Sequence, residues 1–203
     1  MSAQCESRGF SVEDYLRFEE TSEIKHEYIN GEIYAMAGAS ARHNRIILNM
    51  AGPLLSHLRG SPCEVFVADV KLYLRELKQD IFYYPDLMVC CDPNDRDPYY
   101  RTRPCLIVEV LSSGTARIDQ REKLFSYVRL DSLQGYLLLK QDQISATLYR
   151  REGHDWQRMG WTEPQAELLL PCADLTLRLA DLYEGTGLLE GSPVVTSPLR
   201  ITQ

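Results

Sequence analysis

The stretch that decides the fold reads YYPDLMV at residues 83–89, CLIVEVLSSGT at 105–115 and RIDQREKLFSY at 117–127. Asp86 and Glu109 each lie inside an apolar, β-branched run that is typical of a buried strand. A charged carboxylate in such a run is costly unless it is paired or binds a metal. Lys123, on the amphipathic segment that follows, supplies a cation that can share their site. The three residues together suggest metal-assisted chemistry on a phosphate.

The composition is that of an ordinary globular domain, since 44% of the 203 residues are hydrophobic and 25% are charged. We expect one domain at residues 1–186 and a loosely ordered tail at 187–203, which is rich in Gly, Ser, Pro and Thr. No apolar signal segment opens the chain, and no run approaches the roughly 18 apolar residues of a membrane span. We therefore expect a cytoplasmic protein with reduced thiols and no membrane contact.

The net charge of −7 argues against a surface that coats nucleic acid non-specifically, because phosphate binding is normally driven by clustered Lys and Arg. A local basic groove can coexist with an acidic whole. One candidate is the arginine-bearing loop at 96–103, joined by Arg117 and Arg121.

Other metal and phosphate motifs are missing from the sequence. The six cysteines form no CxxC pair, and three of them lie in or next to apolar runs, so small buried side chains are the better interpretation. The four histidines show no HxxxH or HExxH spacing, so zinc fits poorly, and no GxxxxGK[ST] loop occurs. Mg²⁺ suits two carboxylates, because it keeps several waters and completes its octahedron with phosphate oxygens.

The first third of the chain predicts two helices and a hairpin. A capping serine, Ser11, precedes an amphipathic run and predicts the first helix. Alternation on both sides of an Asn-Gly dipeptide predicts a hairpin at 24–36. Helical spacing predicts a long helix at 41–58, with a kink or a break at Pro53, whose ring disrupts the helical hydrogen bonds.

The middle of the chain predicts the main sheet. Residues 63–75 predict its first long strand, and 81–91 predict the strand that returns. The near-continuous apolar run at 105–111 is typical of a strand covered on both faces. A helix at 119–130, opened by a capping-box pattern, precedes a strand at 135–140 that we expect to pair in parallel with 105–111. The fold class is therefore α/β with a mixed sheet.

Lys123 is placed by the direction of its helix. A lysine at this position is more often solvated than catalytic. The helix, however, leaves the end of the strand that bears Glu109, so the Lys123 amine near its beginning can reach back over the edge of that strand. Asp119 and Tyr127 lie one turn away on either side and can orient the amine.

These segments resemble the PD-(D/E)xK nuclease superfamily and, within it, the Uma2 family of restriction-endonuclease-like proteins. The resemblance covers nearly the whole chain from about residue 15 to 185. Each phrase is weak alone, but the set in this order is fairly specific. The matching phrases are HEYINGEIYAMAGAS with RHNRIILN, YYPDLMVCCD, RPCLIVEVLS, DQREKLFSYVRL, LQGYLLL and LADLYEG.

The resemblance implies a restriction-endonuclease-like core, with a central mixed β-sheet flanked by helices, an N-terminal helix and a β-hairpin. Asp86 and Glu109 would bind the metal together with the backbone carbonyl of Val110, and the cofactor would be Mg²⁺, with Mn²⁺ as a substitute. Lys123 would act near the attacking water or the scissile phosphate. The superfamily usually places its lysine two residues after the glutamate, where this chain has Leu111.

An additional upstream acid is common in such sites, and Glu27 is the best match, followed by Glu32; a solvated hairpin edge is the alternative for both. His43 also matches a family phrase, and it either bonds within the site or serves as a helix cap or core residue. Two departures concern the connection to Lys123. The chain has SSGT at 112–115 where the family usually has SPST, and the glycine in this segment loosens the turn. At position 120 the chain has Gln where the family usually has a cation, which removes a possible contact with phosphate.

The leading interpretation is a Mg²⁺-dependent endonuclease that hydrolyses phosphodiester bonds of DNA. The competing interpretation is a non-catalytic scaffold that binds nucleic acid or a protein partner, which the acidic net charge favours. A third is a bare structural ion pair between Lys123 and the acids. Members of the superfamily often pair to cut both strands, so the resemblance also admits a homodimer.

Overall fold

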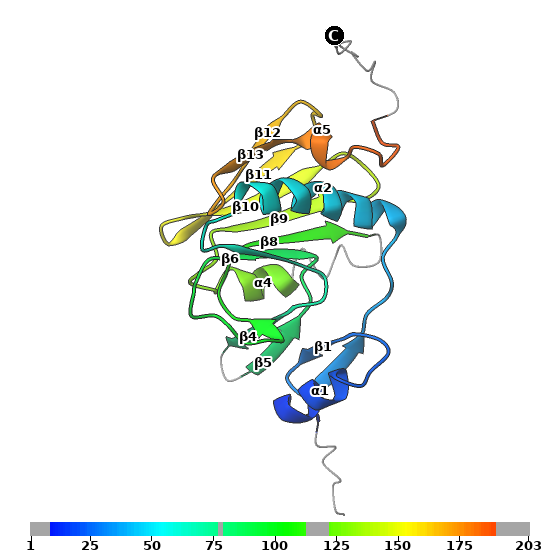
Figure 1. Cartoon of the computed structure of the whole chain (residues 1–203), viewed down its shortest axis with the longest axis vertical. Coiled ribbons are helices and arrows are strands. Elements are labelled where there is room, and N and C mark those ends of the chain that lie inside the picture. The colour runs from blue at the N-terminus through cyan, green and yellow to red at the C-terminus, as the bar shows by residue number, and fades with distance from the viewer. Residues whose placement is uncertain (1–8, 77–78, 113–121, 190–203) are drawn as a thin grey trace, which may run out of the picture.

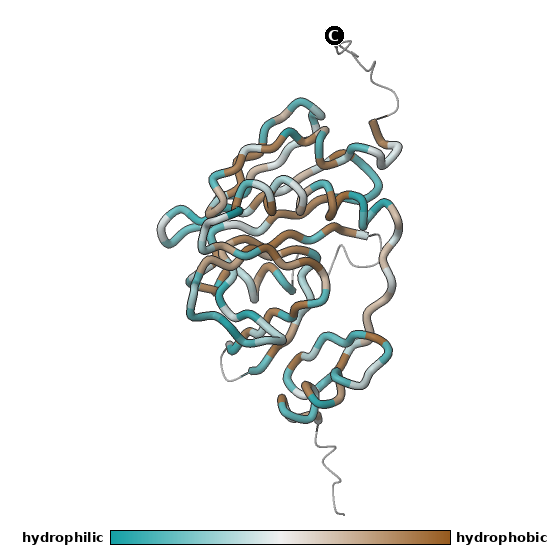
Figure 2. Tube along the Cα trace, viewed as in Figure 1, coloured by the Kyte–Doolittle hydropathy of each residue, from teal (hydrophilic) through white to brown (hydrophobic). Residues whose placement is uncertain are grey.

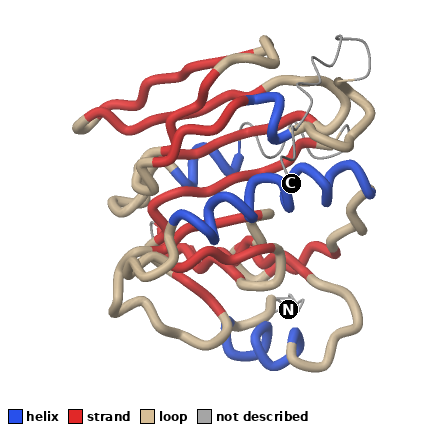
Figure 3. The backbone as a smooth tube through the Cα atoms, turned by 45° about the horizontal axis from the view of Figure 1, so that its top comes forward, coloured by secondary structure: helices blue, strands red, loops and turns tan. Residues whose placement is uncertain are grey.

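The computed structural model describes residues 9–76, 79–112 and 122–189 as a mixed α/β protein built mainly from strands (Figure 1, Figure 3). The main sheet has the order β11-β10-β9-β8-β6-β3 and the second has the order β2-β1-β5-β4-β7. The main strands are β3 (Glu64–Val67), β6 (Leu87–Cys90), β8 (Pro104–Leu111), β9 (Gly135–Lys140), β10 (Ala146–Glu152) and β11 (Asp155–Trp161). The second sheet has β1 (His26–Ile29), β2 (Glu32–Ala35), β4 (Lys71–Glu76), β5 (Gln79–Tyr83) and β7 (Tyr100–Arg101).

The helices are short apart from one. They are α1 (Val12–Glu19), α2 (Ala41–His57), α4 (Leu124–Tyr127) and α5 (Leu179–Leu182), and a small hairpin is formed by β12 (Glu167–Leu170) and β13 (Leu175–Arg178). None of the described helices is long and apolar enough to cross a membrane.

The N-terminal predictions are confirmed. Ser11 caps α1, with its side chain accepting a hydrogen bond from the Asp14 N–H. β1 and β2 form an antiparallel hairpin in which Asn30 and Gly31 both have positive φ, as a two-residue turn of this type requires. The helix α2 is capped by Ser40 and runs through Pro53, so of the two expected alternatives, a kink or a break, the break is wrong.

The prediction of a single central sheet needs a correction. Residues 63–75 are two strands, because the chain leaves β3 at Ala68, whose φ is +56°, and enters β4 in the second sheet. The returning stretch divides in the same way between β5 and β6 at Pro85, which has no N–H for a ladder hydrogen bond. The Ala68 N–H donates to the Asp86 carbonyl at 3.1 Å, so the two crossings lie side by side. The mixed α/β class holds, but with two mixed sheets.

The strand, helix and strand around Glu109 form in the predicted order, but within the described residues the α-helix covers only Leu124–Tyr127 of the predicted 119–130. β9 pairs in parallel with β8, and α4 lies between them in the sequence. Glu122 and Lys123 form a π-helical turn that leads into α4. The predicted capping residue, Asp119, and the departures at 113–115 and Gln120 lie outside the described residues.

The core has two layers, one on each face of the main sheet. On one face α2 packs on alternate side chains of β6, β8 and β9, among them Leu87, Val108 and Leu137. On the other face Ile107 and Leu111 pack with Tyr127 of α4 and with β4 and β5 of the second sheet. Figure 2 shows the hydrophobic residues gathered along these central strands. Glu109, between Ile107 and Leu111, therefore points into the layer that contains α4.

The cysteines do not follow the expectation of reduced thiols. Cys63 is bonded to Cys91 and Cys105 to Cys172, whereas Cys90 is a buried free thiol. Cys90 and Cys105 are both small buried side chains, as predicted, but of these two only Cys90 is a free thiol. The partners lie 28 and 67 residues apart in the sequence, a separation that carries no local signal of pairing.

Candidate active site

Asp86 lies where the chain crosses from the second sheet to the main sheet. Its Oδ2 accepts a hydrogen bond from the Val110 N–H at 2.7 Å. The same oxygen lies 3.1 Å from Nε2 of His43, which stands on the first turn of α2. The Asp86 side chain keeps 20% of its surface exposed, so the carboxylate borders solvent. Asp86 is therefore held both by a main-chain N–H and by a histidine, rather than by main-chain groups of a turn alone.

Glu109 is buried in the middle of the sheet, with 4% of the residue exposed. Its Oε1 accepts hydrogen bonds from the Lys123 ammonium at 3.2 Å and from the Tyr127 hydroxyl at 3.1 Å. Two donors from one short helix thus compensate a charge that would otherwise be costly in this layer.

Lys123 forms ion pairs with one acid from each of the two sheets. Its Nζ lies 3.0 Å from Oε1 of Glu27 on β1 and 3.2 Å from Oε1 of Glu109 on β8. The ammonium also lies over the Tyr83 ring, 5.3 Å from its centroid, and only 7% of the lysine side chain is exposed. β1 pairs with β5 in the second sheet, and this pairing brings Glu27 to the site.

The main chain of Val110 faces Asp86. The carbonyls of Cys105 and Leu111 accept hydrogen bonds from Gln134 and Gln141, on the β9 side of β8. Successive main-chain groups of a strand alternate in direction, so the Val110 N–H and carbonyl point to the β6 side. There β6 pairs with β8 only from Leu87 opposite Val108, and the Val110 N–H meets Asp86 instead. The carbonyl predicted as a metal ligand is thus on the same side of the strand as Asp86.

Tyr127 is the most deeply buried polar group of the site. Burial, and then the charge of Glu109, raise the pKa of its phenol well above the ordinary value of 10.0. Burial likewise raises the pKa of Tyr83. Both phenols therefore stay protonated at neutral pH, and the Tyr127 hydroxyl remains a donor to Glu109.

The predicted residues form two groups of contacts: Asp86 accepts from the Val110 N–H, and Lys123 contacts both Glu27 and Glu109, the neighbour of Val110 in the sequence. Of the two candidate acids of the hairpin, Glu27 reaches Lys123, whereas Glu32 is exposed on β2 and accepts a hydrogen bond from the Tyr34 hydroxyl. The sequence reasoning did not foresee the contact of the Tyr83 ring with Lys123. The aromatic pair that precedes Pro85 was the available signal.

The arginines of the predicted basic loop are less available for binding phosphate than the composition of the loop indicates. Arg101 is buried against the Phe66 ring and lies 3.6 Å from Glu64, and Arg103 is paired with Asp92 at 2.6 Å. Arg117 and Arg121 lie outside the described residues. Arg101 and Arg103 of the loop at 96–103 are therefore engaged in contacts within the protein.

The donors of the site fit a hard divalent cation. Asp86 contacts His43, and Glu27 and Glu109 contact Lys123; carboxylate and carbonyl oxygens are the ligands that Mg²⁺ accepts. Among the described residues, the one set of three candidate ligand atoms within 4.8 Å of one another is formed by cysteines. The ammonium of Lys123 instead stands between Glu27 and Glu109. Asp86, Glu109 and the Val110 carbonyl are the groups that could hold the metal.

A family model described as "Putative restriction endonuclease" matches residues 12–180. The chain belongs to the Uma2 family. This Uma2 chain is 34% identical to the uncharacterized protein slr1290 of Synechocystis sp. over 177 residues, which cover 86% of this chain and 92% of the relative. It is 36% identical to a second uncharacterized Synechocystis protein, sll1609, over 75% of this chain and 87% of that relative.

The fold is similar to a crystal structure from Anabaena variabilis, titled a putative nuclease belonging to DUF820. The TM-score is 0.71 at 18% identity, covering 86% of this Uma2 chain and 97% of the other. At this identity the likeness concerns the fold. The predicted family is therefore confirmed, and the chemistry rests on the residues described above.

Proposed function

We propose that this Uma2 protein is a Mg²⁺-dependent endonuclease that hydrolyses phosphodiester bonds of DNA. The observation that carries the proposal is the convergence of Asp86, Glu109 and Lys123 from three separate segments, with the Val110 main chain facing Asp86. A purely structural ion pair requires only Lys123 and one acid. It does not require the Asp86 carboxylate, which borders solvent and contacts His43, or the Glu27 carboxylate of the hairpin.

In this proposal the metal is held by the Asp86 and Glu109 carboxylates and the Val110 carbonyl. When bound, the metal polarises the phosphate and lowers the pKa of a coordinated water. Lys123 donates hydrogen bonds to the phosphate oxygens, where negative charge accumulates in the transition state. Mn²⁺ can replace Mg²⁺, because both accept the same oxygen ligands in octahedral geometry.

The neighbouring residues hold these groups in place. Tyr127 donates to Glu109 and fixes the rotamer of a carboxylate that would otherwise turn within its pocket. His43 and the Val110 N–H share one oxygen of Asp86, so the plane of that carboxylate is set from two directions. Glu27 holds the Lys123 ammonium against the Tyr83 ring. Support of this kind preserves the geometry that phosphoryl chemistry requires.

Nicking of supercoiled plasmid DNA with Mg²⁺ or Mn²⁺ tests the proposal. We expect cleavage by the wild type and its loss in Asp86→Asn, Glu109→Gln and Lys123→Met, each shown to be folded by circular dichroism. Glu32→Gln is the matched control, because it removes an exposed acid of the same hairpin and should cleave normally. A wild type that cuts neither DNA nor RNA with either metal would remove the main support for an enzyme.

A non-catalytic scaffold is the second candidate, favoured by the net charge of −7 and the internal pairing of Arg101 and Arg103. Titration of Mg²⁺ into the protein by calorimetry separates the two. The enzyme requires a binding isotherm that Asp86→Asn abolishes, whereas a scaffold requires none. The proposal also includes a homodimer, because each chain carries one site and cutting both strands of a duplex takes two. Sedimentation velocity measures this assembly.

A further inference from the structure

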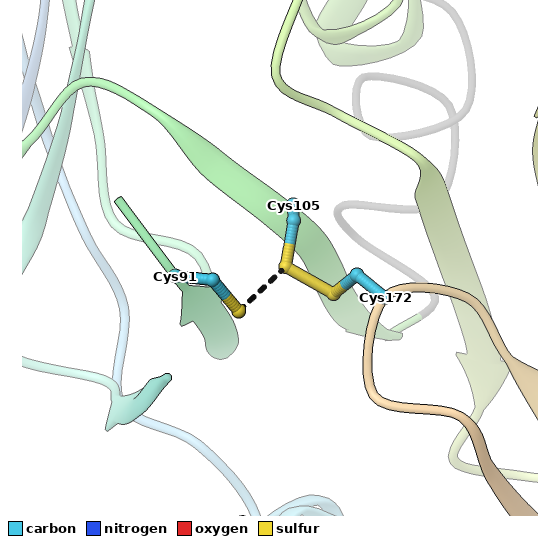
Figure 4. A group of neighbouring side chains, drawn as sticks. All are labelled: Cys91, Cys105 and Cys172. Carbon is cyan, nitrogen blue, oxygen red and sulfur yellow. Dashed lines mark hydrogen bonds between the residues drawn. A yellow bond between two sulfur atoms is a disulfide. The ribbon is translucent and has the colours of Figure 1, made fainter. Parts of the chain in front are cut away.

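Four of the six cysteines gather at one end of the main sheet. Cys63 immediately precedes β3, Cys91 follows β6, Cys105 lies in β8, and Cys172 stands in the turn between β12 and β13. The Sγ atoms of Cys91, Cys105 and Cys172 all lie within 4.8 Å of one another (Figure 4). Cys63 is bonded to Cys91 and so brings a fourth sulfur next to Cys91, although it stands outside that set of three. Four separate segments of the chain thus supply one group of sulfur atoms.

The sheet register explains the convergence. β3 and β6 are antiparallel with Glu64 opposite Cys90, which sets Cys63 across from Cys91. A bulge at Val89 and Cys90 shifts β6 against β8, and Cys91 Sγ comes to lie 3.5 Å from Cys105 Sγ. Cys172 completes the group because its backbone has a φ of +62°, which turns the chain between β12 and β13.

Two disulfides explain the cluster only in part. A disulfide requires that two cysteines approach each other, and the pairs Cys63–Cys91 and Cys105–Cys172 do so. The contact of Cys91 with Cys105 belongs to neither pair. In a tetrahedral zinc site the Zn–S bonds of about 2.3 Å place the sulfurs about 3.8 Å apart. The separation between the two pairs is close to this value.

The surroundings suit a structural metal. Cys105 is 6% exposed, whereas Cys63, Cys91 and Cys172 are half-buried, so ions from solution can reach the sulfurs. A closed tetrahedral set of four cysteines is a common structural zinc site, although its ligands usually come in closely spaced C-x₂₋₄-C pairs. Spacing arguments miss this one because it contains no CxxC pair.

We propose that Cys63, Cys91, Cys105 and Cys172, when reduced, bind one Zn²⁺ as a tetrathiolate. Starting from the paired form, a dithiol reductant gives each disulfide two electrons and two protons and is itself oxidised to a disulfide. The four thiols then release four protons to solution as four Zn–S bonds form. The cluster thus has an oxidised form with two disulfides and a reduced form that binds metal.

The site would tie the β12–β13 hairpin to the far end of the strands that carry the candidate active site. Asp86 precedes β6 and Cys91 follows it, a rise of about 16 Å along a strand. Glu109 and Cys105 lie toward opposite ends of β8. The metal would therefore support the β6–β8 pair without touching its carboxylates, and the proposal does not depend on nuclease activity.

Metal binding by the reduced full-length chain is the test. Under anaerobic conditions with the disulfides reduced, we expect one Zn²⁺ per chain after gel filtration. Co²⁺ in its place should give the strong visible bands of a tetrahedral thiolate site. Each of Cys63→Ser, Cys91→Ser, Cys105→Ser and Cys172→Ser should weaken Zn²⁺ binding at least tenfold. Cys90→Ser is the matched control, since this neighbouring thiol lies in the other core layer.

A measurement on the wild type avoids variants that fail to fold. Zn²⁺ should protect four of the six thiols of the reduced chain from an alkylating reagent, as read by mass spectrometry of its peptides. The proposal is overturned if the reduced wild type retains no metal and simply reoxidises to the two disulfides. It is also overturned if Cys90→Ser abolishes binding while the four cluster variants retain it.

Discussion

The Lys123 ammonium and the Glu109 carboxylate form a buried ion pair at 3.2 Å, across 14 positions of sequence. One partner stands on a central strand and the other at the start of a short helix, so the pair fixes the helix against the sheet. Glu27, at 3.0 Å from the same ammonium, extends this contact to the second sheet. The position of Lys123 is therefore determined by two acids as much as by the connection that precedes it.

Removing the ammonium should cost considerable stability. Lys123→Met leaves Glu27 and Glu109 without their shared cation, and we expect the free energy of unfolding at pH 7 to fall by about 3–5 kcal/mol. Urea denaturation followed by circular dichroism measures the change. Lys25→Met is the matched control, because Lys25 is paired with Asp69 at the surface and should change stability by less than about 1 kcal/mol. Equal small effects of the two substitutions would contradict the buried pair.

Glu27 should matter for the rate of cleavage, whereas Glu32 should not. Glu27→Gln keeps the shape of the side chain but weakens its hold on Lys123, so we expect single-turnover nicking to slow about 10- to 100-fold, as for other groups that orient a reactive residue. Glu32→Gln should cleave at the wild-type rate. Mn²⁺ binding should be little changed in Glu27→Gln, which distinguishes loss of lysine positioning from loss of the metal. A normal rate for Glu27→Gln would remove this acid from the site.

The raised pKa of Tyr127 should make the folded protein less stable at alkaline pH. Its pKa is raised in the folded chain by burial and by Glu109, whereas in the unfolded chain it ionises near pH 10. Above that pH the unfolded state binds fewer protons, so stability falls as pH rises. Tyr127→Phe should cost about 1 kcal/mol at pH 7 through the lost hydrogen bond but flatten the decline above pH 10. Urea denaturation between pH 7 and 11 measures both effects, and an unchanged slope would refute the assignment.

Arg151 should stabilise the segment that follows Lys123. From β10 its guanidinium donates to the carbonyls of Val128, Leu130 and Leu133 and lies over the Trp156 ring at 4.6 Å. Arg151→Met removes the guanidinium donor from these carbonyls, of which the Leu130 carbonyl keeps the Leu133 N–H, and we expect a loss of about 1.5–3 kcal/mol. The control is Arg150→Met on the same strand, expected to stay within about 0.5 kcal/mol. Thermal or urea unfolding of both variants measures whether the two substitutions differ in the stability that they cost.

Local signals predicted the local structure. The Asn-Gly turn, the serine caps and the alternation of helix and strand around Glu109 each depend on a few adjacent residues, and each is found in the structure. The crossings at Ala68 and Pro85 were missed because hydrophobic residues continue on both sides of each crossing. The sheet that a strand joins depends on its pairing partner. When that partner is distant in the sequence, the residues of the strand itself do not identify it.

The site was predicted in part for the same reason. Asp86, Glu109 and Lys123 stand out because charge within an apolar run is unusual. The family resemblance ranked Glu27 ahead of Glu32, but their spacing alone did not separate them, since both lie on one hairpin and the long-range pairing of β1 with β5 decides which acid reaches Lys123. The cysteine cluster was missed entirely, because its four members come from strands and a turn that meet only in the folded chain.

An anomalous difference map from a crystal soaked with Mn²⁺ tests the central claim most directly. The account predicts one strong peak at ligand distance, about 2.2 Å, from carboxylate oxygens of Asp86 and Glu109 and from the Val110 carbonyl oxygen. The peak should be absent from Asp86→Asn crystals soaked in the same way. A map with no peak between Asp86 and Glu109, in crystals whose site is open to solvent, would contradict the proposed metal-dependent nuclease site.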